Sequence, residues 1–419
     1  MERTLLVTIK LDYQDDNWRL EDIADELESL TEACGAKIID HVTCLRDRPT
    51  AGLFIGSGKA EEIALICQEE KIDTVIFSED LSGVQQRNLE DILGKKTIDR
   101  TQLILHIFAK HASSLEGKMQ VELAQLQYIM PRLTGKGIIL SRQGGGIGTS
   151  GPGETKLEVD RRRIRKRIEK LKDDLKHLSL HRTTMRKKRQ ENSVASIALV
   201  GYTNAGKSTL LNLLTGSNQV VRNGLFTTLD PLTKSLRLPN GENVIISDTV
   251  GFLHNLPHHL IEAFKATLEE VSQSDLLIHV LDVSHQRTRE HYESVLEVLK
   301  ELESDQKPII NALNKIDLLE DKAWLGRMKE DFSGSIAISA KSGENIDTLI
   351  KEIQKKFVSK MTELDISIPN TRMDLVNLFY REGQVKDIQY LEKSIKIKLF
   401  LPTILYHKLL DSKQIENNC

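Results

Sequence analysis

The sequence predicts a multidomain α/β protein built around a P-loop nucleotide-binding domain. A glycine-rich loop ending in Lys207 and Ser208 lies between an apolar, β-branched run and an apolar helical run. Strand-like and helix-like runs alternate before it, and 419 residues are enough for about three domains by size. We expect an α/β domain at 1–111, a helical hairpin at 112–192, the nucleotide domain at 193–360 and a small α+β domain at 361–419.

The loop has the pattern and the context of a phosphate-binding P-loop, because residues 195–200 before it read as a strand and 209–214 after it as a helix. It consists of Gly201, Tyr202, Thr203, Asn204, Ala205, Gly206, Lys207 and Ser208. Glycines let backbone N–H groups close around phosphates, and the helix N-terminus adds the positive end of its dipole. We expect Lys207 to contact the β- and γ-phosphates and Ser208 to ligate Mg²⁺. The alternative is a glycine-rich turn that binds nothing.

The strand predicted at 243–247 leads into a second phosphate segment. This segment consists of Asp248, Thr249, Val250 and Gly251. An Asp at such a strand end supports Mg²⁺, here through a water molecule, and the Gly251 N–H can then meet the γ-phosphate. We therefore expect Asp248 and Gly251 to complete the phosphate side of the site.

Two later segments indicate which base is bound. They follow strand-like runs at 307–313 and 336–338, and they consist of Asn314, Lys315, Ile316 and Asp317, and of Ser339, Ala340 and Lys341. Asp317 can accept from N1–H and the 2-amino group of guanine, whereas adenine would leave the carboxylate unpaired at a cost of about 1–3 kcal/mol. Asn314 suits N7, Lys315 can cover the ring, and a backbone N–H of the last segment can reach O6. Alone, each segment is typical of a solvated turn.

The order of these segments at strand ends carries the argument, because ligands of open α/β sheets bind at the carboxyl ends of the strands. Residues 195–360 thereby resemble the P-loop GTPase G domain of translation-factor-related proteins. Between Ser208 and Asp248 lie Phe226, Thr227, Thr228, Leu229 and Asp230, followed by Pro231. GTPases need a threonine here that joins the Mg²⁺ shell only with the γ-phosphate present. Thr227 and Thr228 compete, and we favour Thr228 because Obg- and HflX-like GTPases carry a similar Phe-x-Thr-Leu-Asp-Pro. A plain Asx-Pro turn is the alternative.

Phe252 follows Gly251, where many GTPases place a Gln that orients the attacking water. Phe can neither donate to nor accept from that water. We therefore expect slow intrinsic turnover, roughly 10⁻⁴–10⁻² s⁻¹, as is typical when a transition-state group is missing. A rearranged loop, a K⁺ ion or a partner would supply that group.

Composition indicates a cytoplasmic protein without stable membrane insertion, and it leaves peripheral association with a membrane open. The N-terminus lacks the apolar stretch of a signal peptide, and no run approaches the roughly twenty apolar residues of a membrane span. The four cysteines have neither metal-type spacing nor a disulfide pattern. We expect a monomer.

The first 111 residues read as a small α/β domain, with strands at 5–9, 36–42 and 74–77 and helices at 20–27 and 60–66. Ile55-Gly56-Ser57-Gly58-Lys59 resembles a second P-loop. Its spacing fails, because Leu53 stands where Gly is needed and Ala60 where Ser or Thr is needed. We interpret it as a tight turn into a helix.

Helical patterns at 112–131 and 157–190 predict an antiparallel hairpin. The second has a coiled-coil seam of Ile164, Ile168, Leu171, Leu175 and Leu178. Its residues 160–189 carry fourteen Lys and Arg against four Asp and Glu, although the whole chain has a net charge of only −3. Residues 142–155 join the helices and are glycine-rich, which suits close approach to RNA phosphates. A flexible linker and a solvated basic helix are the alternatives.

The strongest resemblance is to the HflX GTPases, over about residues 50–360. It rests on the motifs 125–133, 141–148, 151–158 and 160–162, and on Gly251-Phe252 followed by Leu256-Pro257-His258 and Ala263-Phe264. The resemblance implies a GTPase with GTP/GDP and Mg²⁺ as cofactors that binds the large ribosomal subunit and its rRNA. It also implies splitting or rescue of stalled ribosomes under stress.

We therefore expect GTP hydrolysis with Lys207, Thr228 and Gly251 as the catalytic groups and Ser208 and Thr228 as Mg²⁺ ligands. One alternative is an RNA-binding module whose G domain only senses GTP. Another is an ATP-dependent RNA remodeller that acts through the N-terminal domain. The small domain after residue 360 has an alternating strand at 394–400, and composition assigns it no function.

Overall fold

The computed structural model describes residues 2–12, 18–133, 156–191, 194–217, 225–226, 230–255, 257, 260, 265–319, 323–332, 334–358, 361–402, 406 and 409. Three of the predicted site residues, Thr227, Thr228 and Leu229, lie outside this part of the chain. So does the glycine-rich segment at 142–155. The predictions on those residues stay predictions.

The N-terminal part is a parallel sheet with helices, as the alternating runs predicted. Its elements are β1 (Arg3–Leu11), α1 (Leu20–Cys34), β2 (Lys37–Arg46), α2 (Ser57–Glu69), β3 (Thr74–Phe77), α3 (Gly83–Leu93), β4 (Lys96–Asp99) and α4 (Arg100–His111). The strand order is β2-β1-β3-β4. Gly56 is the N-cap of α2, so the segment that resembled a second P-loop leads into a helix.

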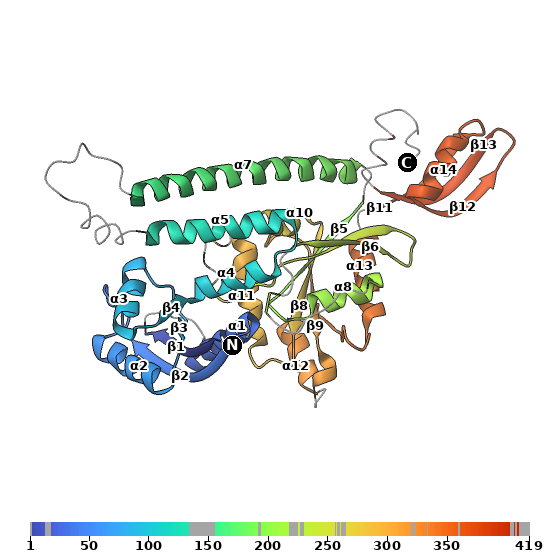
Figure 1. Ribbon diagram of the computed structural model, residues 1–419. Coiled ribbons are helices and arrows are strands. Elements are labelled where there is room, and N and C mark those ends of the chain that lie inside the picture. Colours follow the sequence, from blue (N-terminus) through green and yellow to red (C-terminus); the bar gives the residue numbers. More distant parts are fainter. Residues whose placement is uncertain are drawn as a thin grey trace.

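Two long helices follow and lie side by side above the sheets (Figure 1). They are α5 (Leu115–Arg132) and α7 (Lys156–Glu191). Ile168 and Leu171 of the predicted seam are buried against Leu123 of α5, and Ile164 and Leu175 flank them. The Arg167 guanidinium also pairs with Glu122 across the two helices at 2.6 Å. The predicted pairing of the helices is confirmed.

The nucleotide domain has a six-stranded sheet of order β10-β9-β8-β5-β7-β6, in which only the β6–β7 pair is antiparallel. Its elements are β5 (Ser196–Val200), α8 (Lys207–Thr215), β6 (Leu232–Arg237), β7 (Asn243–Asp248), α10 (Lys265–Gln273), β8 (Leu276–Asp282), α11 (Thr288–Glu301), β9 (Ile309–Asn314), a 3₁₀ turn at Ile316–Leu318, α12 (Ala323–Asp331), β10 (Ile336–Ala337) and α13 (Ile346–Val358). Apolar residues of β5 and β8 pack on both faces of this sheet. Because β5, β7, β8, β9 and β10 run parallel, the segments that follow them lie at the same end of the sheet. The predicted site segments therefore share one sheet edge.

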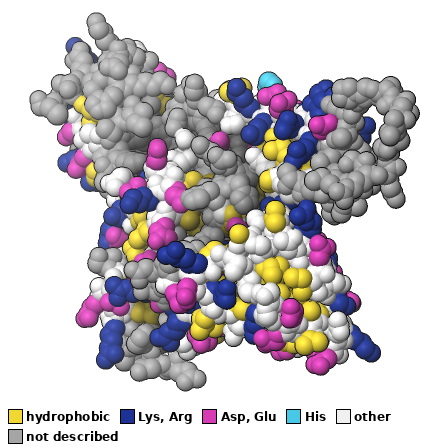
Figure 2. All heavy atoms as spheres, turned by 90° about the vertical axis from the view of Figure 1, so that its left-hand side faces the viewer, with side chains coloured by type: hydrophobic (Ala, Val, Ile, Leu, Met, Phe, Trp, Pro, Cys, Tyr) yellow, Lys and Arg dark blue, Asp and Glu magenta, His cyan; other side chains and the backbone are white. Residues whose placement is uncertain are grey.

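The C-terminal part is a three-stranded antiparallel sheet of order β11-β13-β12, and the helix α14 packs against it. Its elements are β11 (Met361–Pro369), α14 (Met373–Glu382), β12 (Gln384–Tyr390) and β13 (Ser394–Pro402). In the described residues, every helix is too short or too polar to cross a membrane. On the face shown in Figure 2, Lys and Arg are interspersed with Asp and Glu and do not form a patch of one sign.

Candidate functional site

The loop between β5 and α8 is shaped by two glycines with positive φ. Gly201 has φ 155°, and a Cβ there would collide with the Val280 carbonyl of β8. Gly206 has φ 98° and caps α8, and a Cβ there would collide with the Asn314 side chain. Because only glycine fits at both positions, the backbone can close tightly over the start of α8. This is the geometry that a phosphate-binding loop requires.

The side chain of Lys207 is buried at the N-terminus of α8. Its Nζ donates to the backbone oxygens of Gly201 at 3.0 Å and Tyr202 at 2.8 Å. Burial lowers the pKa of Lys207 to about 8, although the nearby Asp248 carboxylate opposes the shift. An ammonium group whose pKa is lowered by burial suits an anionic ligand, because a phosphate would stabilise its charged form.

This lowered pKa predicts that nucleotide binding takes up protons. Below pH 8 Lys207 is already charged, whereas above pH 8 binding of a phosphate must recharge it, so affinity falls as pH rises. The protein can be titrated calorimetrically with GDP in the presence of Mg²⁺, in two buffers of different ionisation enthalpy. GDP binding should take up about half a proton at pH 8 and about a tenth of a proton at pH 7. Equal uptake at the two pH values would contradict this assignment.

The predicted Mg²⁺ residues lie together at the start of α8. The Ser208 hydroxyl donates to Asp248 Oδ2 at 2.6 Å, and Asp248 is 1% exposed at the end of β7. A hydroxyl and a carboxylate are the hard oxygen donors that Mg²⁺ prefers, so this pair fits the ion. The third expected residue, Thr228, lies outside the described residues.

The segment after β7 contacts the P-loop through its backbone. Thr203 N–H donates to the Phe252 carbonyl at 2.9 Å, and Phe252 N–H donates to the Gly201 carbonyl at 3.1 Å. A Cβ on Gly251 would lie 2.7 Å from Thr203 Cγ2 and 3.1 Å from Lys207 Nζ. Gly251 therefore lies beside the phosphate-binding lysine, and any larger residue would crowd it.

Phe252 points away from this site. Its ring is 1% exposed and packs with Ala198, Leu268 and Leu277 in the core. The sequence predicted that Phe252 cannot orient a water molecule by its chemistry. The structure adds that its ring is held in the core behind the site.

The base-side segments are joined by one buried amide. Asn314 Nδ2 donates to the Ala205 carbonyl of the P-loop at 2.8 Å, and Asn314 Oδ1 accepts from Ala340 N–H at 2.9 Å. Ser339 Oγ donates to Asp317 Oδ1 at 2.7 Å, which orients an otherwise exposed carboxylate. The structure thus brings the three predicted segments to one place.

Lys315 has a partner that the sequence reasoning did not identify. Its φ is 68°, and its Nζ pairs with Asp282 Oδ2 at 2.5 Å. Asp282 ends β8, so the signal that could have found it is its position at a strand end. The pair holds the Lys315 stem beside the base segment. Ile316 is buried next to it, while Lys341 is exposed.

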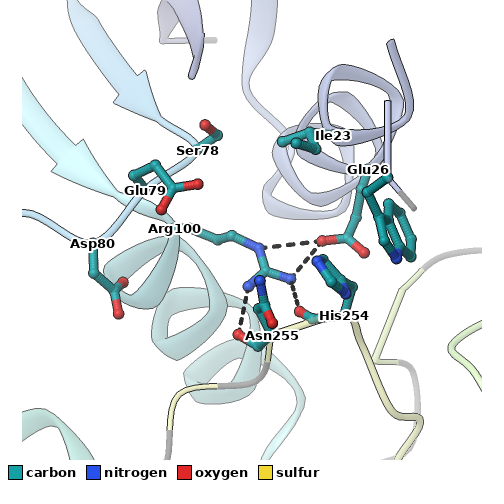
Figure 3. A pocket seen from close by; sticks show the side chains of 9 residues that line it. Ile23, Glu26, Ser78, Glu79, Asp80, Arg100, His254 and Asn255 are labelled. Atoms are coloured by element: carbon teal, nitrogen blue, oxygen red, sulfur yellow. Dashed lines mark hydrogen bonds and ion pairs between the residues drawn. The ribbon is translucent and has the colours of Figure 1, made fainter. Parts of the chain in front are cut away.

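The N-terminal domain contacts the site, and no sequence motif indicated this. Arg100 of α4 pairs with Glu26 of α1 at 2.5 Å and donates to the carbonyls of His254 at 2.5 Å and Asn255 at 2.9 Å (Figure 3). The Tyr202 hydroxyl of the P-loop donates to the same Glu26 carboxylate. Glu26, Arg100, His254 and Asn255 line a cavity of about 110 Å³ between the two domains. The P-loop is thus tied to α1, and the segment after Gly251 is tied to α4.

Two residues of the predicted threonine segment are described. Phe226 is buried, and the Asp230 carboxylate accepts hydrogen bonds from Ser113 and Ser114. The sequence predicted that Asp230 contacts the nucleotide. In the structure its carboxylate instead lies at the start of α5.

In a comparison with known proteins, four protein-family models match successive regions of the chain. They are a GTP-binding GTPase N-terminal region at 21–109, a GTP-binding GTPase middle region at 111–189, a 50S ribosome-binding GTPase at 196–315 and an HflX C-terminal domain at 326–403. The third model covers the P-loop, Asp248 and the residues through Lys315.

Several curated relatives align over nearly their whole length, and each has the name GTPase HflX. The protein of Caldanaerobacter subterraneus is 45% identical over 95% of this chain and 90% of the relative. The protein of Lacrimispora saccharolytica is 42% identical over 99% of this chain and 97% of the relative. The protein of Escherichia coli is 37% identical over 97% of this chain and 95% of the relative. A solved GTP-binding protein from Sulfolobus solfataricus in complex with GDP is 28% identical, with a TM-score of 0.45 over 85% of this chain and 98% of that one.

Proposed function

Because the chain belongs to the HflX family of GTPases, we propose that it couples GTP hydrolysis at the site described above to binding of the large ribosomal subunit. Hydrolysis of GTP to GDP and phosphate is the activity of the family. The observation that supports this site most is the convergence of Lys207, Ser208, Asp248 and Asp317 at one sheet edge.

Each site residue has a proposed role. Lys207 and the amides of the P-loop neutralise charge on the phosphates, and the Gly251 N–H contacts the γ-phosphate. Ser208 would ligate Mg²⁺, Asp248 would support its water shell, and Thr228 would join that shell in the GTP state. The ion would supply positive charge that neutralises the β- and γ-phosphates.

The remaining predicted residues hold the nucleotide in register. On the base side these are Asn314, Lys315, Ile316, Asp317, Ser339, Ala340 and Lys341. Around the phosphates they are Tyr202, Thr203, Asn204, Ala205, Phe226, Thr227, Leu229, Thr249 and Val250. Asn314 also has a structural role, because its side-chain amide forms hydrogen bonds to both the P-loop and the 339–341 segment.

A partner is the proposed source of the missing catalytic group. Phe252 lies in the core and cannot orient water, so the isolated protein hydrolyses GTP slowly. The large ribosomal subunit would rearrange the segment after Gly251 or contribute a group of its own. In this proposal the GTP state binds the subunit, acts on stalled ribosomes and leaves after hydrolysis, in the cytoplasm and as a monomer.

The basic helix α7 is the proposed rRNA contact. The side chains of Arg165 and Lys166 are exposed, whereas Ile168 and Leu171 face α5. One side of α7 thus builds the hairpin and the other offers positive charge. Phosphate contacts of this kind make affinity depend steeply on salt.

We expect the double substitution R165A/K166A to weaken binding to purified large subunits about tenfold, and to lower the salt slope of log affinity by about one per lost contact. The check is co-sedimentation with a non-hydrolysable GTP analogue over a range of salt. The matched control is K300A/K329A, which removes two exposed lysines from α11 and α12. Equal loss in both variants would exclude a specific role for α7.

A further inference from the structure

The threonine segment of the G domain is flanked by residues that contact the end of α4 and the start of the hairpin helix α5. Phe226 precedes Thr227, Thr228 and Leu229, and Asp230 follows them. Both flanking residues contact the turn between α4 and α5, defined here as the α4–α5 corner, residues 108–117. Only three residues of the chain separate the two contacts.

The Asp230 carboxylate caps α5 from outside its own domain. Oδ2 accepts from Ser113 N–H at 3.0 Å, Ser113 Oγ at 2.6 Å and Ser114 N–H at 2.8 Å, and Oδ1 accepts from Ser114 Oγ. Ser114 is also the N-cap of α5, since its Oγ accepts from Gly117 N–H at 2.8 Å. A carboxylate is stabilised there both by charge-assisted hydrogen bonds and by the helix dipole.

The protonation of Asp230 agrees with this contact. Burial acts to raise the pKa of Asp230, but the hydrogen bonds from Ser113 and Ser114 outweigh it and hold the pKa below its usual range. The carboxylate is therefore charged at neutral pH, which is the form that accepts all four hydrogen bonds.

Close approach at this contact depends on Gly117. A Cβ on Gly117 would collide with Asp230 Oδ1 and lie 3.1 Å from Ser114 Oγ. Gly117 lies in the first turns of α5, where a glycine is otherwise unfavourable compared with alanine. The glycine therefore makes room for the Asp230 carboxylate.

The other flank is held by aromatic packing. The Phe226 ring meets Phe108 of α4 edge to face, with centroids 4.5 Å apart, and is 2% exposed. It belongs to the same apolar cluster as Tyr202 of the P-loop and Val250 before Gly251. Phe226 thus shares one buried apolar cluster with a residue of each phosphate segment.

We propose that Asp230 is a positioning residue for GTP hydrolysis, which acts by fixing the threonine segment to the α4–α5 corner through Ser113, Ser114 and Gly117. The proposal rests on the assignment of Thr228 as an Mg²⁺ ligand. Holding Phe226 and Asp230 in place before the nucleotide and Mg²⁺ bind lowers the conformational entropy that must be lost when the site assembles. Because Ser114 starts α5, a partner that moves the hairpin helices also moves this anchor.

Gly117→Ala tests the anchor without touching a nucleotide-binding residue. We expect affinity for a non-hydrolysable GTP analogue with Mg²⁺, and single-turnover hydrolysis, to fall about tenfold, while GDP affinity stays within about twofold. The matched control is Gly326→Ala in α12, where a Cβ meets nothing within 4 Å and no change is expected. Alanine has a higher helix propensity than glycine, so the substitution by itself would stabilise α5. A change in helix propensity therefore cannot explain a loss of affinity or of hydrolysis.

A double-mutant cycle with Asp230→Ala separates positioning from general damage. If Gly117→Ala acts by displacing Asp230, it should have no further effect in the Asp230→Ala background. Additive losses, an equal loss of GDP affinity, or an unchanged Gly117→Ala would each overturn the proposal. Should Gly117→Ala fail to fold, Asp230→Asn gives the same comparison of GTP analogue with GDP. A wild-type protein that does not bind GTP would instead refute the proposed function.

Discussion

Replacing Lys207 with alanine should abolish GTP hydrolysis, with kcat/KM falling by at least about 10³-fold. In the structure Lys207 Nζ lies beside Gly251 and faces the P-loop carbonyls of Gly201 and Tyr202. It is the buried cation placed to meet the β- and γ-phosphates, and alanine leaves the phosphate charge without it. Radiolabelled or phosphate-release assays at saturating Mg²⁺ would measure the loss.

The same variant separates the proposed enzyme from its alternatives. Lys300→Ala, an exposed lysine of α11, should leave turnover unchanged and serves as the charge control. If the chain were an RNA-binding module that only senses GTP, Lys207→Ala would leave RNA affinity the same with and without nucleotide. ATP hydrolysis that survives in Lys207→Ala would point instead to a remodeller acting through the N-terminal domain.

Replacing Asp317 with asparagine should change the preferred nucleotide from GTP to xanthosine triphosphate. The carboxylate is oriented by Ser339 Oγ at 2.7 Å and is proposed to accept from N1–H and the 2-amino group of guanine. An asparagine amide would meet the 2-amino group with a donor of its own, whereas xanthine offers a carbonyl oxygen there. We expect GTP affinity to fall about 10²-fold and xanthosine triphosphate to recover most of it.

Fluorescence competition with the two nucleotides measures this exchange directly. Parallel losses for both nucleotides would mean that Asp317 supports the fold of the base segment and does not read the base. Asparagine has nearly the same volume and can still accept from Ser339, so the variant should fold.

The nucleotide side of the site could be predicted from sequence because its signals are local. A glycine loop between a strand and a helix fixes Lys207 and Ser208, and strand ends fix Asp248 and Asp317. The hairpin was predictable for a similar reason, since the spacing of Ile164, Ile168 and Leu171 leaves one apolar face that needs a partner helix.

The contacts between domains could not be predicted in the same way. Glu26 lies on an amphipathic helix and Arg100 is the first residue of α4, and either would be read as a solvated charge. Only the docking of the domains brings them to Tyr202 and to the segment after Gly251. Asp230 shows the same limit, because an Asp-Pro pair indicates a turn and gives no sign of Ser113 in another domain.

Phe252 is intermediate between these cases. Its chemistry predicted that it cannot orient water, but its side-chain direction depends on the core formed by β5, β8 and α10. That core holds the ring behind the site, so the catalytic group must come from elsewhere.

The most direct measurement is GTP turnover by the wild-type protein, alone and with purified large ribosomal subunits, at fixed salt and K⁺. Salt must be fixed because electrostatic binding to RNA falls steeply as salt rises. We expect a slow basal rate that the subunit raises strongly. A rate that the subunit leaves unchanged would contradict coupling to the ribosome, although the site itself would remain that of a GTPase.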